Sequence, residues 1–258
     1  MLALQAAFVA GKKILEIYNK TITVDYKSDG SPLTEADLAS HQIIVNVLQS
    51  SGLPILSEEG KDIPFYERRN WKYYWLVDPL DGTKEFIKRN GEFTINIALM
   101  KNQHPCAGII FQPVTGVAYA GIDGDGLYKF YVDEKIDPDS YRNCKANKVE
   151  FHSPAEENKI RVIASRSHKS DETENFINNL RLTKNNIELI NAGSSLKFCL
   201  LAEGIADIYP RFAPTMEWDT AAGHALLKSV GKNIYLHPGG SEMTYNNPRL
   251  INEWFIAR

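Results

Sequence analysis

The chain has 258 residues, of which 43% are hydrophobic and 24% charged, and its formal net charge is −3. This is the composition of an ordinary globular protein that is large enough to bury a substantial core. The negative balance argues against polymeric nucleic acid as a partner, because such binding depends on a basic surface that displaces counterions. A small anionic ligand is compatible with it, provided that metal ions or a few lysines and arginines supply local positive charge.

Membrane insertion and disulfide scaffolding are both disfavoured. No apolar stretch approaches the roughly 20 residues that span a bilayer, and the N-terminus lacks the pattern of a signal peptide. We therefore expect a cytoplasmic protein with no integral membrane segment, and the sequence leaves peripheral contact with the inner membrane and the oligomeric state open. Three widely separated cysteines, Cys106, Cys144 and Cys199, predict neither a disulfide framework nor a zinc cluster.

The first half of the chain predicts helices followed by a sheet. Apolar residues at helical spacing between Leu4 and Tyr18 indicate an amphipathic helix, and Thr21 to Lys27 alternates like a strand. A second helix is predicted from Thr34 to Ser50. Its expected apolar side is Leu38, His41, Ile44, Val45 and Leu48. Short strands follow at Pro54–Ser57, Tyr73–Val77, Phe93–Met100, Pro105–Phe111, Val117–Ala120 and Leu127–Tyr131. They predict a meandering, largely antiparallel sheet.

A polar segment from Asp133 to Asn158 predicts a boundary between two lobes, 1–150 and 151–258. Strand-like and helical stretches alternate beyond it. The strand-like ones are Arg161–Ala164, Glu188–Ile190 and Ala206–Tyr209, and the helical ones are Asp171–Leu180, Ser194–Glu203 and Thr220–Ser229. This rhythm predicts an α/β layer.

The segment Asp78-Pro79-Leu80-Asp81-Gly82-Thr83 follows an aromatic and β-branched run that suits a buried strand ending at Asp78. Pro79 stiffens the bend, so that two carboxylates and the Leu80 carbonyl offer oxygen ligands to a hard cation such as Mg²⁺. Gly82 permits close backbone approach, and Thr83 can cap a helical turn whose N–H groups point at an anion. A plain turn with two solvated aspartates explains this motif alone equally well.

Three further carboxylate motifs stand where an element begins or ends. Thr34 and Asp37 fit a helix capping box, or else Asp37 is a base or a metal-associated carboxylate. The adjacent Glu58 and Glu59 follow a predicted strand, where glutamates are usually solvated but can also enter a cleft. Asp219, beside the bulky Trp218, precedes an apolar helix, and capping and metal binding are equally good explanations of it.

Polar loops in the second half suit an anion. Gly193-Ser194-Ser195-Leu196-Lys197 lies between a predicted strand and helix, where hydroxyls and backbone N–H groups can receive a phosphate, although an ordinary glycine turn with a serine cap also fits. Lys197 and Arg211 add positive charge. His168, in another loop after a strand, faces either a ligand or solvent. Asp123-Gly124-Asp125-Gly126 lacks the remaining ligands of a calcium loop and predicts a hairpin turn.

The acidic residues Asp37, Glu58, Asp78, Asp81 and Asp219 would repel one another if they converged without cations. Two or three Mg²⁺ ions remove this difficulty, and an ion pair can bind a phosphate, acidify water and neutralise the leaving oxygen.

In their order and local sequence, these segments resemble the inositol monophosphatase superfamily of magnesium-dependent, lithium-sensitive phosphatases. The resemblance covers nearly the whole chain and rests on residues 75–83 and 218–223 together with Glu58-Glu59. Residues 193–198 and Tyr209-Pro210-Arg211 are most similar to the bacterial 3'(2'),5'-bisphosphate nucleotidases. Those enzymes remove the 3'-phosphate from adenosine 3',5'-bisphosphate, a by-product of sulfate assimilation, to give AMP.

The resemblance implies a fold and a metal centre. The fold is an alternating layered α/β/α/β/α sandwich with the metal site between its lobes. The cofactor is Mg²⁺, as two or three ions. Glu58, Asp78 and the Leu80 carbonyl would hold one ion, and Asp78, Asp81 and Asp219 a second. Asp37 with the Thr83 hydroxyl would orient and deprotonate the attacking water, and Glu59 would support the ligands from behind.

The resemblance also implies a small-molecule nucleotide bisphosphate as substrate. The backbone N–H groups of Gly82 and Thr83 would receive the scissile phosphate. The nucleotide side maps onto Gly193, Ser194, Ser195, Lys197 and Arg211, and we extend it to His168. Three alternatives are an inositol monophosphatase or fructose-1,6-bisphosphatase-type sugar phosphatase, a non-catalytic nucleotide sensor, and a magnesium nuclease, which the charge balance opposes.

Overall fold

The computed structural model describes residues 1–27, 30–132, 146–149, 159–164, 170–183 and 186–258. Its helices are α1 Leu2–Tyr18, α2 Glu35–Leu48, α3 Phe65–Arg68, α4 Thr83–Ile87, α6 Asp171–Thr183, α7 Leu196–Ala202 and α8 Glu217–Lys228, with a 3-10 turn, η1, at Gln49–Ser51. None of the described helices has the length and apolar character needed to cross a membrane.

A seven-stranded sheet forms the centre of the molecule. Its strands, in spatial order, are β3 Ile55–Ser57, β4 Tyr73–Asp81, β5 Thr94–Lys101, β6 His104–Gln112, β7 Val117–Ile122, β8 Gly126–Tyr131 and β9 Ala146–Lys148. Spatial and sequence order coincide, so hairpins join most neighbours, and only the β3–β4 pair is parallel. The predicted meandering, largely antiparallel sheet is confirmed.

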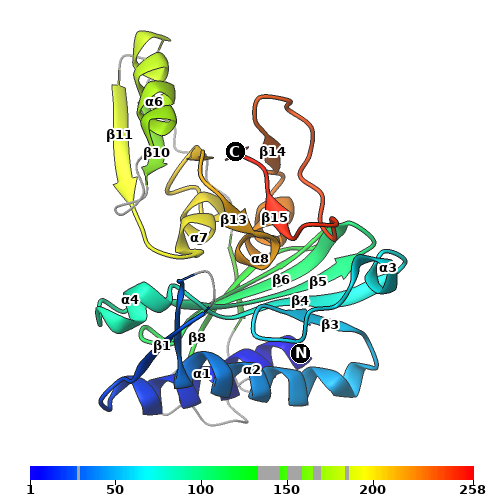
Figure 1. The fold of residues 1–258 in the computed structure, drawn as a ribbon. Coiled ribbons are helices and arrows are strands. Elements are labelled where there is room, and N and C mark those ends of the chain that lie inside the picture. Colours follow the sequence, from blue (N-terminus) through cyan, green and yellow to red (C-terminus); the bar gives the residue numbers. More distant parts are fainter. Residues whose placement is uncertain (28–29, 133–145, 150–158, 165–169, 184–185) are drawn as a thin grey trace.

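Helices cover both faces of this sheet, as Figure 1 shows: α1 and α2 lie on one face, and α7 and α8 on the other. Along β5, Ile95 and Ile97 join the core under α1 and α2, whereas Ala98 and Met100 join the core under α7 and α8. Because both faces are buried, the central strands are apolar almost throughout instead of alternating with polar residues.

Smaller sheets lie beyond α7 and α8 (Figure 1). The parallel pair β10 Lys159–Ala164 and β11 Asn186–Asn191 packs with α6. The others are β12 Tyr209–Arg211, β16 Phe255–Ala257 and β14 Ile234–Leu236 in one sheet, and β13 Thr215–Met216 with β15 Ile251–Asn252 in another. A separate hairpin, β1 Val24–Tyr26 with β2 Pro32–Thr34, precedes α2. The predicted layered α/β sandwich is confirmed, and the predicted lobe boundary falls outside the described residues.

The buried side of α2 differs from the prediction. Ile44 and Leu48 are buried as predicted and His41 and Val45 are partly buried, but Leu38 is 50% exposed, and the helix also buries Ala36 and Ser40. The Ser40 hydroxyl donates to the Pro79 carbonyl of β4, so a contact with the neighbouring strand accounts for the burial of this polar side chain. The strand predicted at Thr21–Lys27 is shorter than expected, because only the three residues of β1 are extended. The strand predicted at Ala206–Tyr209 is displaced, because β12 begins at Tyr209.

Two glycines bring α8 close to the sheet. A Cβ atom on Gly108 of β6 would lie 2.5 Å from the carbonyl oxygen of Ala222, and one on Gly121 of β7 would lie 2.6 Å from the Cα atom of Leu226. Both obstacles are helix backbone, which cannot rotate away. The absence of a side chain at these positions therefore sets the height of α8 above the sheet.

We predict that Gly108→Ala destabilises the protein by about 1–3 kcal/mol, the usual penalty for overpacking. The free energy of unfolding, measured by urea denaturation, tests this. The matched control is Gly239→Ala, since a Cβ atom on Gly239 meets nothing within 4 Å. Equal stabilities for the two variants would contradict the packing argument.

Candidate active site

An irregularity in the β4–β5 ladder shapes the first acidic motif. Asp78 pairs with Asn96 and Asp81 pairs with Thr94, so β4 contains one residue more than β5 between these points. Pro79 has no N–H group to donate to the ladder, and an extra residue beside it produces a bulge. The strand thus continues to Asp81 instead of ending at Asp78, and our prediction of its end is wrong. The stiff bend itself is present, and the Ser40 hydroxyl donates to the Pro79 carbonyl at 2.7 Å.

Gly82 redirects the chain after the bulge. Its φ of +92° lies in the left-handed region, which glycine adopts without steric cost, and α4 begins directly after it. The turn brings the Thr83 hydroxyl back over the motif. That hydroxyl donates to Asp37 Oδ1 at 3.1 Å and lies 3.5 Å from the Leu80 carbonyl oxygen.

Asp37 is a buried carboxylate with an ordered set of donors. The predicted capping box is present, because Thr34 Oγ1 accepts from the Ala36 N–H while Asp37 Oδ2 accepts from the Thr34 N–H at 2.7 Å. The Thr83 hydroxyl donates to the other oxygen of Asp37. The carboxylate of Asp37 therefore caps α2 and belongs to the acidic site at the same time. Burial raises the pKa of Asp37, and the hydrogen bonds from Thr34 and Thr83 only partly oppose this. Such a carboxylate suits a general base.

Lys27 joins the site although the sequence did not single it out. Its ammonium group lies 2.8 Å from Glu58 Oε1 and 2.5 Å from Glu59 Oε1. Burial alone would lower the pKa of Lys27, but the two glutamates outweigh it and raise that pKa. Burial raises the pKa of Glu58. The hairpin β1–β2 is therefore held against the acidic residues by an ion pair between residues about thirty positions apart.

Asp78 and Asp219 complete the acidic set. Asp78 is 1% exposed and accepts from the Leu80 N–H at 3.0 Å, while Asp219, at the third position of α8, accepts from the Met216 N–H at 2.8 Å. Burial, reinforced by the negative charge of neighbouring carboxylates, raises the pKa of both groups well above the usual range. The negative charge of Glu58 is one of those that raise the pKa of Asp78. Residues far apart in the sequence thus converge.

The donor set fits Mg²⁺ in its chemistry. It consists of oxygen ligands only, with Asp78 buried and Glu58, Asp81 and Asp219 partly buried, and no lysine or arginine of the described chain forms a salt bridge with Asp78, Asp81 or Asp219. Buried carboxylates without paired cations are unfavourable unless ions neutralise them. As they stand, no three His, Cys, Asp or Glu side chains in the described ranges are arranged to hold one ion, and Lys27 draws Glu58 and Glu59 to itself.

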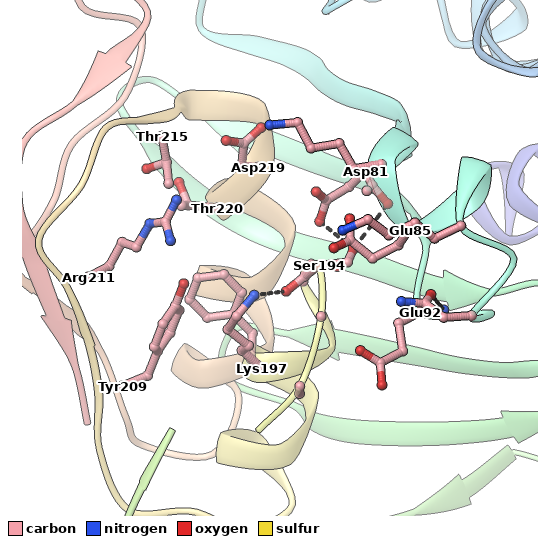
Figure 2. A pocket seen from close by; sticks show the side chains of 18 residues that line it. Asp81, Glu85, Glu92, Ser194, Lys197, Tyr209, Arg211, Thr215, Asp219 and Thr220 are labelled. Atoms are coloured by element: carbon pink, nitrogen blue, oxygen red, sulfur yellow. Dashed lines mark hydrogen bonds between the residues drawn. The ribbon is translucent and has the colours of Figure 1, made fainter. Parts of the chain in front are cut away.

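A cavity of about 490 Å³ opens beside these carboxylates. Figure 2 shows Asp81 and Asp219 along one part of its wall and Lys197, Tyr209 and Arg211 along another. Lys197 is buried, and its ammonium donates to the Ser194 carbonyl at 2.7 Å. Burial lowers its pKa to about 8.

Arg211 is the second cation of this wall. Its Nε atom is buried without a hydrogen-bond partner among the described residues, and its Nη2 reaches only the Pro214 carbonyl at 3.5 Å. No carboxylate in the described part of the chain forms a salt bridge with Lys197 or Arg211. Two positively charged side chains that face one cavity and have so few hydrogen-bond or ion-pair partners indicate a binding site for an anion.

The structure brings the predicted site residues together in one region. Those that line the cavity are Asp81, Gly82, Gly193, Ser194, Ser195, Lys197, Arg211 and Asp219. Those joined to them by hydrogen bonds or by charge are Asp37, Glu58, Glu59, Asp78, Leu80 and Thr83. His168 lies outside the described residues, so its predicted role stays a prediction.

Thr94 and Asn96 are residues that sequence reasoning missed. Both are fully buried on β5, and they contact the serines of the loop before α7. The signal was present in the sequence, because a threonine and an asparagine two positions apart interrupt an otherwise apolar strand. Buried polar side chains need partners, and these find them in the site.

The chain is similar to known proteins over almost its whole length. The family model described as "Inositol monophosphatase family" matches residues 1–254. The Escherichia coli protein named 3'(2'),5'-bisphosphate nucleotidase CysQ is 42% identical over 240 residues, covering 90% of this chain and 87% of that protein. Its Buchnera aphidicola namesake is 42% identical over 259 residues, covering 98% and 91%.

A solved structure shows the same fold. The crystal structure of CysQ from Bacteroides thetaiotaomicron, described as a bacterial member of the inositol monophosphatase family, superposes with a TM-score of 0.87 at 46% identity, covering 100% of this chain and 96% of that one. Family model, relatives and fold coincide over almost the entire length. The chain therefore belongs to the inositol monophosphatase family.

Proposed function

We propose that the protein is a magnesium-dependent phosphomonoesterase that removes the 3'-phosphate of adenosine 3',5'-bisphosphate to give AMP and phosphate. The observation that carries this proposal is one cavity with two kinds of wall, acidic at Asp81 and Asp219 and cationic at Lys197 and Arg211. A substrate with two phosphates matches both walls. The names of the relatives, 3'(2'),5'-bisphosphate nucleotidases, support the same assignment.

In this proposal the oxygen donors have separate tasks. Glu58, Asp78 and the Leu80 carbonyl would hold one Mg²⁺, and Asp78, Asp81 and Asp219 would hold another. Bound Mg²⁺ supplies positive charge that stabilises phosphoryl transfer and acidifies water. Glu59 is not a ligand in this proposal. It shares the ammonium group of Lys27 with Glu58 and so helps to hold Glu58 in position.

Asp37 and Thr83 handle the proton. The Thr83 hydroxyl already donates to Asp37 Oδ1, so its oxygen is free to accept a hydrogen bond from the attacking water. As the water attacks phosphorus, its proton moves to the Thr83 oxygen while the hydroxyl proton of Thr83 moves to Asp37. The bond between phosphorus and the 3'-oxygen breaks, and the 3'-oxygen takes a proton from solvent water to become the 3'-hydroxyl of AMP. The raised pKa of Asp37 favours this transfer, because it makes the carboxylate a stronger base.

The cationic wall sets the substrate class. Lys197 and Arg211 bind the phosphate that is not cleaved, and the Gly193–Ser195 loop contacts the nucleoside between the two phosphates. Inositol 1-phosphate offers no second anion, so it would leave two cations uncompensated in the cavity. We therefore expect discrimination against it to be large.

A substrate panel tests the proposed function. We expect phosphate release from adenosine 3',5'-bisphosphate with a kcat/KM on the order of 10²-fold or more above that for inositol 1-phosphate, because about 3 kcal/mol is a typical contribution from hydrogen bonds between charged groups. Fructose 1,6-bisphosphate separates recognition of two phosphates from recognition of a nucleoside. A preference for inositol 1-phosphate would refute the substrate assignment.

The metal ligands are tested by Asp81→Asn. This change keeps the size of the side chain but removes the charge of a proposed ligand, so kcat/KM should fall by more than about 100-fold while the protein stays folded. Activity at saturating Mg²⁺ and circular dichroism are the two measurements. Asp123→Asn, in an exposed hairpin turn, is the matched control and should retain activity. Near-normal turnover of Asp81→Asn would exclude Asp81 as a ligand.

The cationic wall predicts a pH dependence. Because burial lowers the pKa of Lys197 to about 8, its ammonium group is charged at pH 7 and neutral at pH 9. We expect KM for adenosine 3',5'-bisphosphate to rise about tenfold across that interval, in proportion to the loss of the protonated form.

Two lysine variants separate this effect from general titration. Lys197→Met should raise KM at pH 7 and remove its pH dependence. Lys232→Met is the matched control, because burial also lowers the pKa of Lys232 to about 8 but its side chain does not line the cavity. A KM that is flat from pH 7 to 9 in the unmodified protein would show that Lys197 does not bind the substrate through its charge.

A further inference from the structure

A chain of hydroxyl groups links the acidic motif to the loop before α7. Ser194 Oγ lies 2.6 Å from Asp81 Oδ2 and 2.6 Å from Thr94 Oγ1. Thr94 Oγ1 lies 2.7 Å from Ser195 Oγ, which donates to Asn96 Oδ1 at 2.7 Å. Thr94, Asn96 and Ser195 are buried, so water competes little with these bonds.

Ser194 holds an uncommon backbone conformation. Its φ is +50°, in the left-handed region where a residue with a side chain is disfavoured relative to glycine. One contact explains why a serine stands there, because its side-chain hydroxyl donates to Asp81. Its backbone carbonyl oxygen also accepts from the Lys197 ammonium at 2.7 Å. Figure 2 shows both bonds meeting at this residue. Ser194 thus touches the acidic wall and the cationic wall at once.

The two oxygens of Asp81 have different surroundings. Oδ2 accepts from Ser194 at 2.6 Å and lies 3.4 Å from Asn96 Nδ2. No hydrogen bond from the described residues reaches Oδ1. A carboxylate held through one oxygen keeps a single orientation and presents the other oxygen to a ligand.

We propose that Ser194 is a positioning residue of the metal centre. Its hydroxyl fixes Asp81 through Oδ2 so that Oδ1 faces the cation, and the loop 193–197 therefore contributes to metal affinity as well as to nucleotide binding. This inference rests on the proposed function for the identity of the ion. It concerns the affinity for Mg²⁺ and not the choice of phosphate ester.

The test is Mg²⁺ binding in the absence of nucleotide. The protein is treated with a chelator and dialysed, and magnesium chloride is titrated into it by isothermal calorimetry. Ser194→Gly removes the hydroxyl and suits the left-handed backbone, and Ser194→Ala removes it with the smallest change in volume. We expect both variants to bind Mg²⁺ about tenfold or more weakly, the usual effect of losing a partner that orients a metal ligand. Circular dichroism of the chelated variants checks that they fold.

Ser195→Ala is the matched control. Its hydroxyl belongs to the same loop but bonds to the neutral groups of Thr94 and Asn96, so Mg²⁺ affinity should fall less than about threefold. Unchanged or tighter Mg²⁺ binding by Ser194→Gly would overturn the proposal, as would an equal loss in Ser195→Ala. If the unmodified protein binds no Mg²⁺, the proposed function fails together with this inference. If it binds Mg²⁺ but prefers another ester, only the substrate assignment fails.

Discussion

Mutual repulsion among buried carboxylates is the constraint on which the site depends. The negative charges of Glu58, Asp81 and Asp219 act on Asp78, and together with burial they raise its pKa well above the usual range. Bringing such groups together is unfavourable in a low-dielectric interior. The rest of the structure must therefore supply the energy that holds them in place, and the interactions that do so lie outside the carboxylates themselves.

Packing of the two halves of the chain opposes that repulsion. The central sheet has an apolar core on each face, and α8 lies so close to β6 and β7 that only glycine fits at positions 108 and 121. Asp219 is carried on the first turn of this helix, and the bulge after Asp78 is carried on β4 beneath it. Hydrophobic burial over a wide area thus holds like charges together within a small one.

Hydrogen bonds then set the orientation of each carboxylate. Asp37 is held by Thr34 and Thr83, Asp219 by a backbone N–H group, and Asp81 by Ser194. Each donor leaves part of the carboxylate available for another partner. The cationic wall is built in the same way, because the Ser194 carbonyl holds Lys197 at the edge of the cavity. The proposed metal ligand Asp81 and the proposed substrate-binding residue Lys197 are consequently both held in place by Ser194.

The sequence alone determined features that depend on neighbouring residues. The stiff bend at Asp78-Pro79-Leu80-Asp81 follows from the ring of Pro79, and the capping box follows from the three-residue spacing of Thr34 and Asp37. Most strands of the central sheet were equally readable, because both faces are buried and the strands are apolar almost throughout. The set of acidic residues could also be assembled, since its motifs resemble those of a known family.

Only the tertiary structure decided which distant residues meet. The pairing of Lys27 with Glu58 and Glu59, and the contact of Thr94 and Asn96 with the serine loop, join residues that no local pattern relates. The same holds for the exposure of Leu38, which the packing of α2 determines. Periodicity and spacing report conformation within one element, whereas these contacts arise from how elements stack, and that depends on the whole chain.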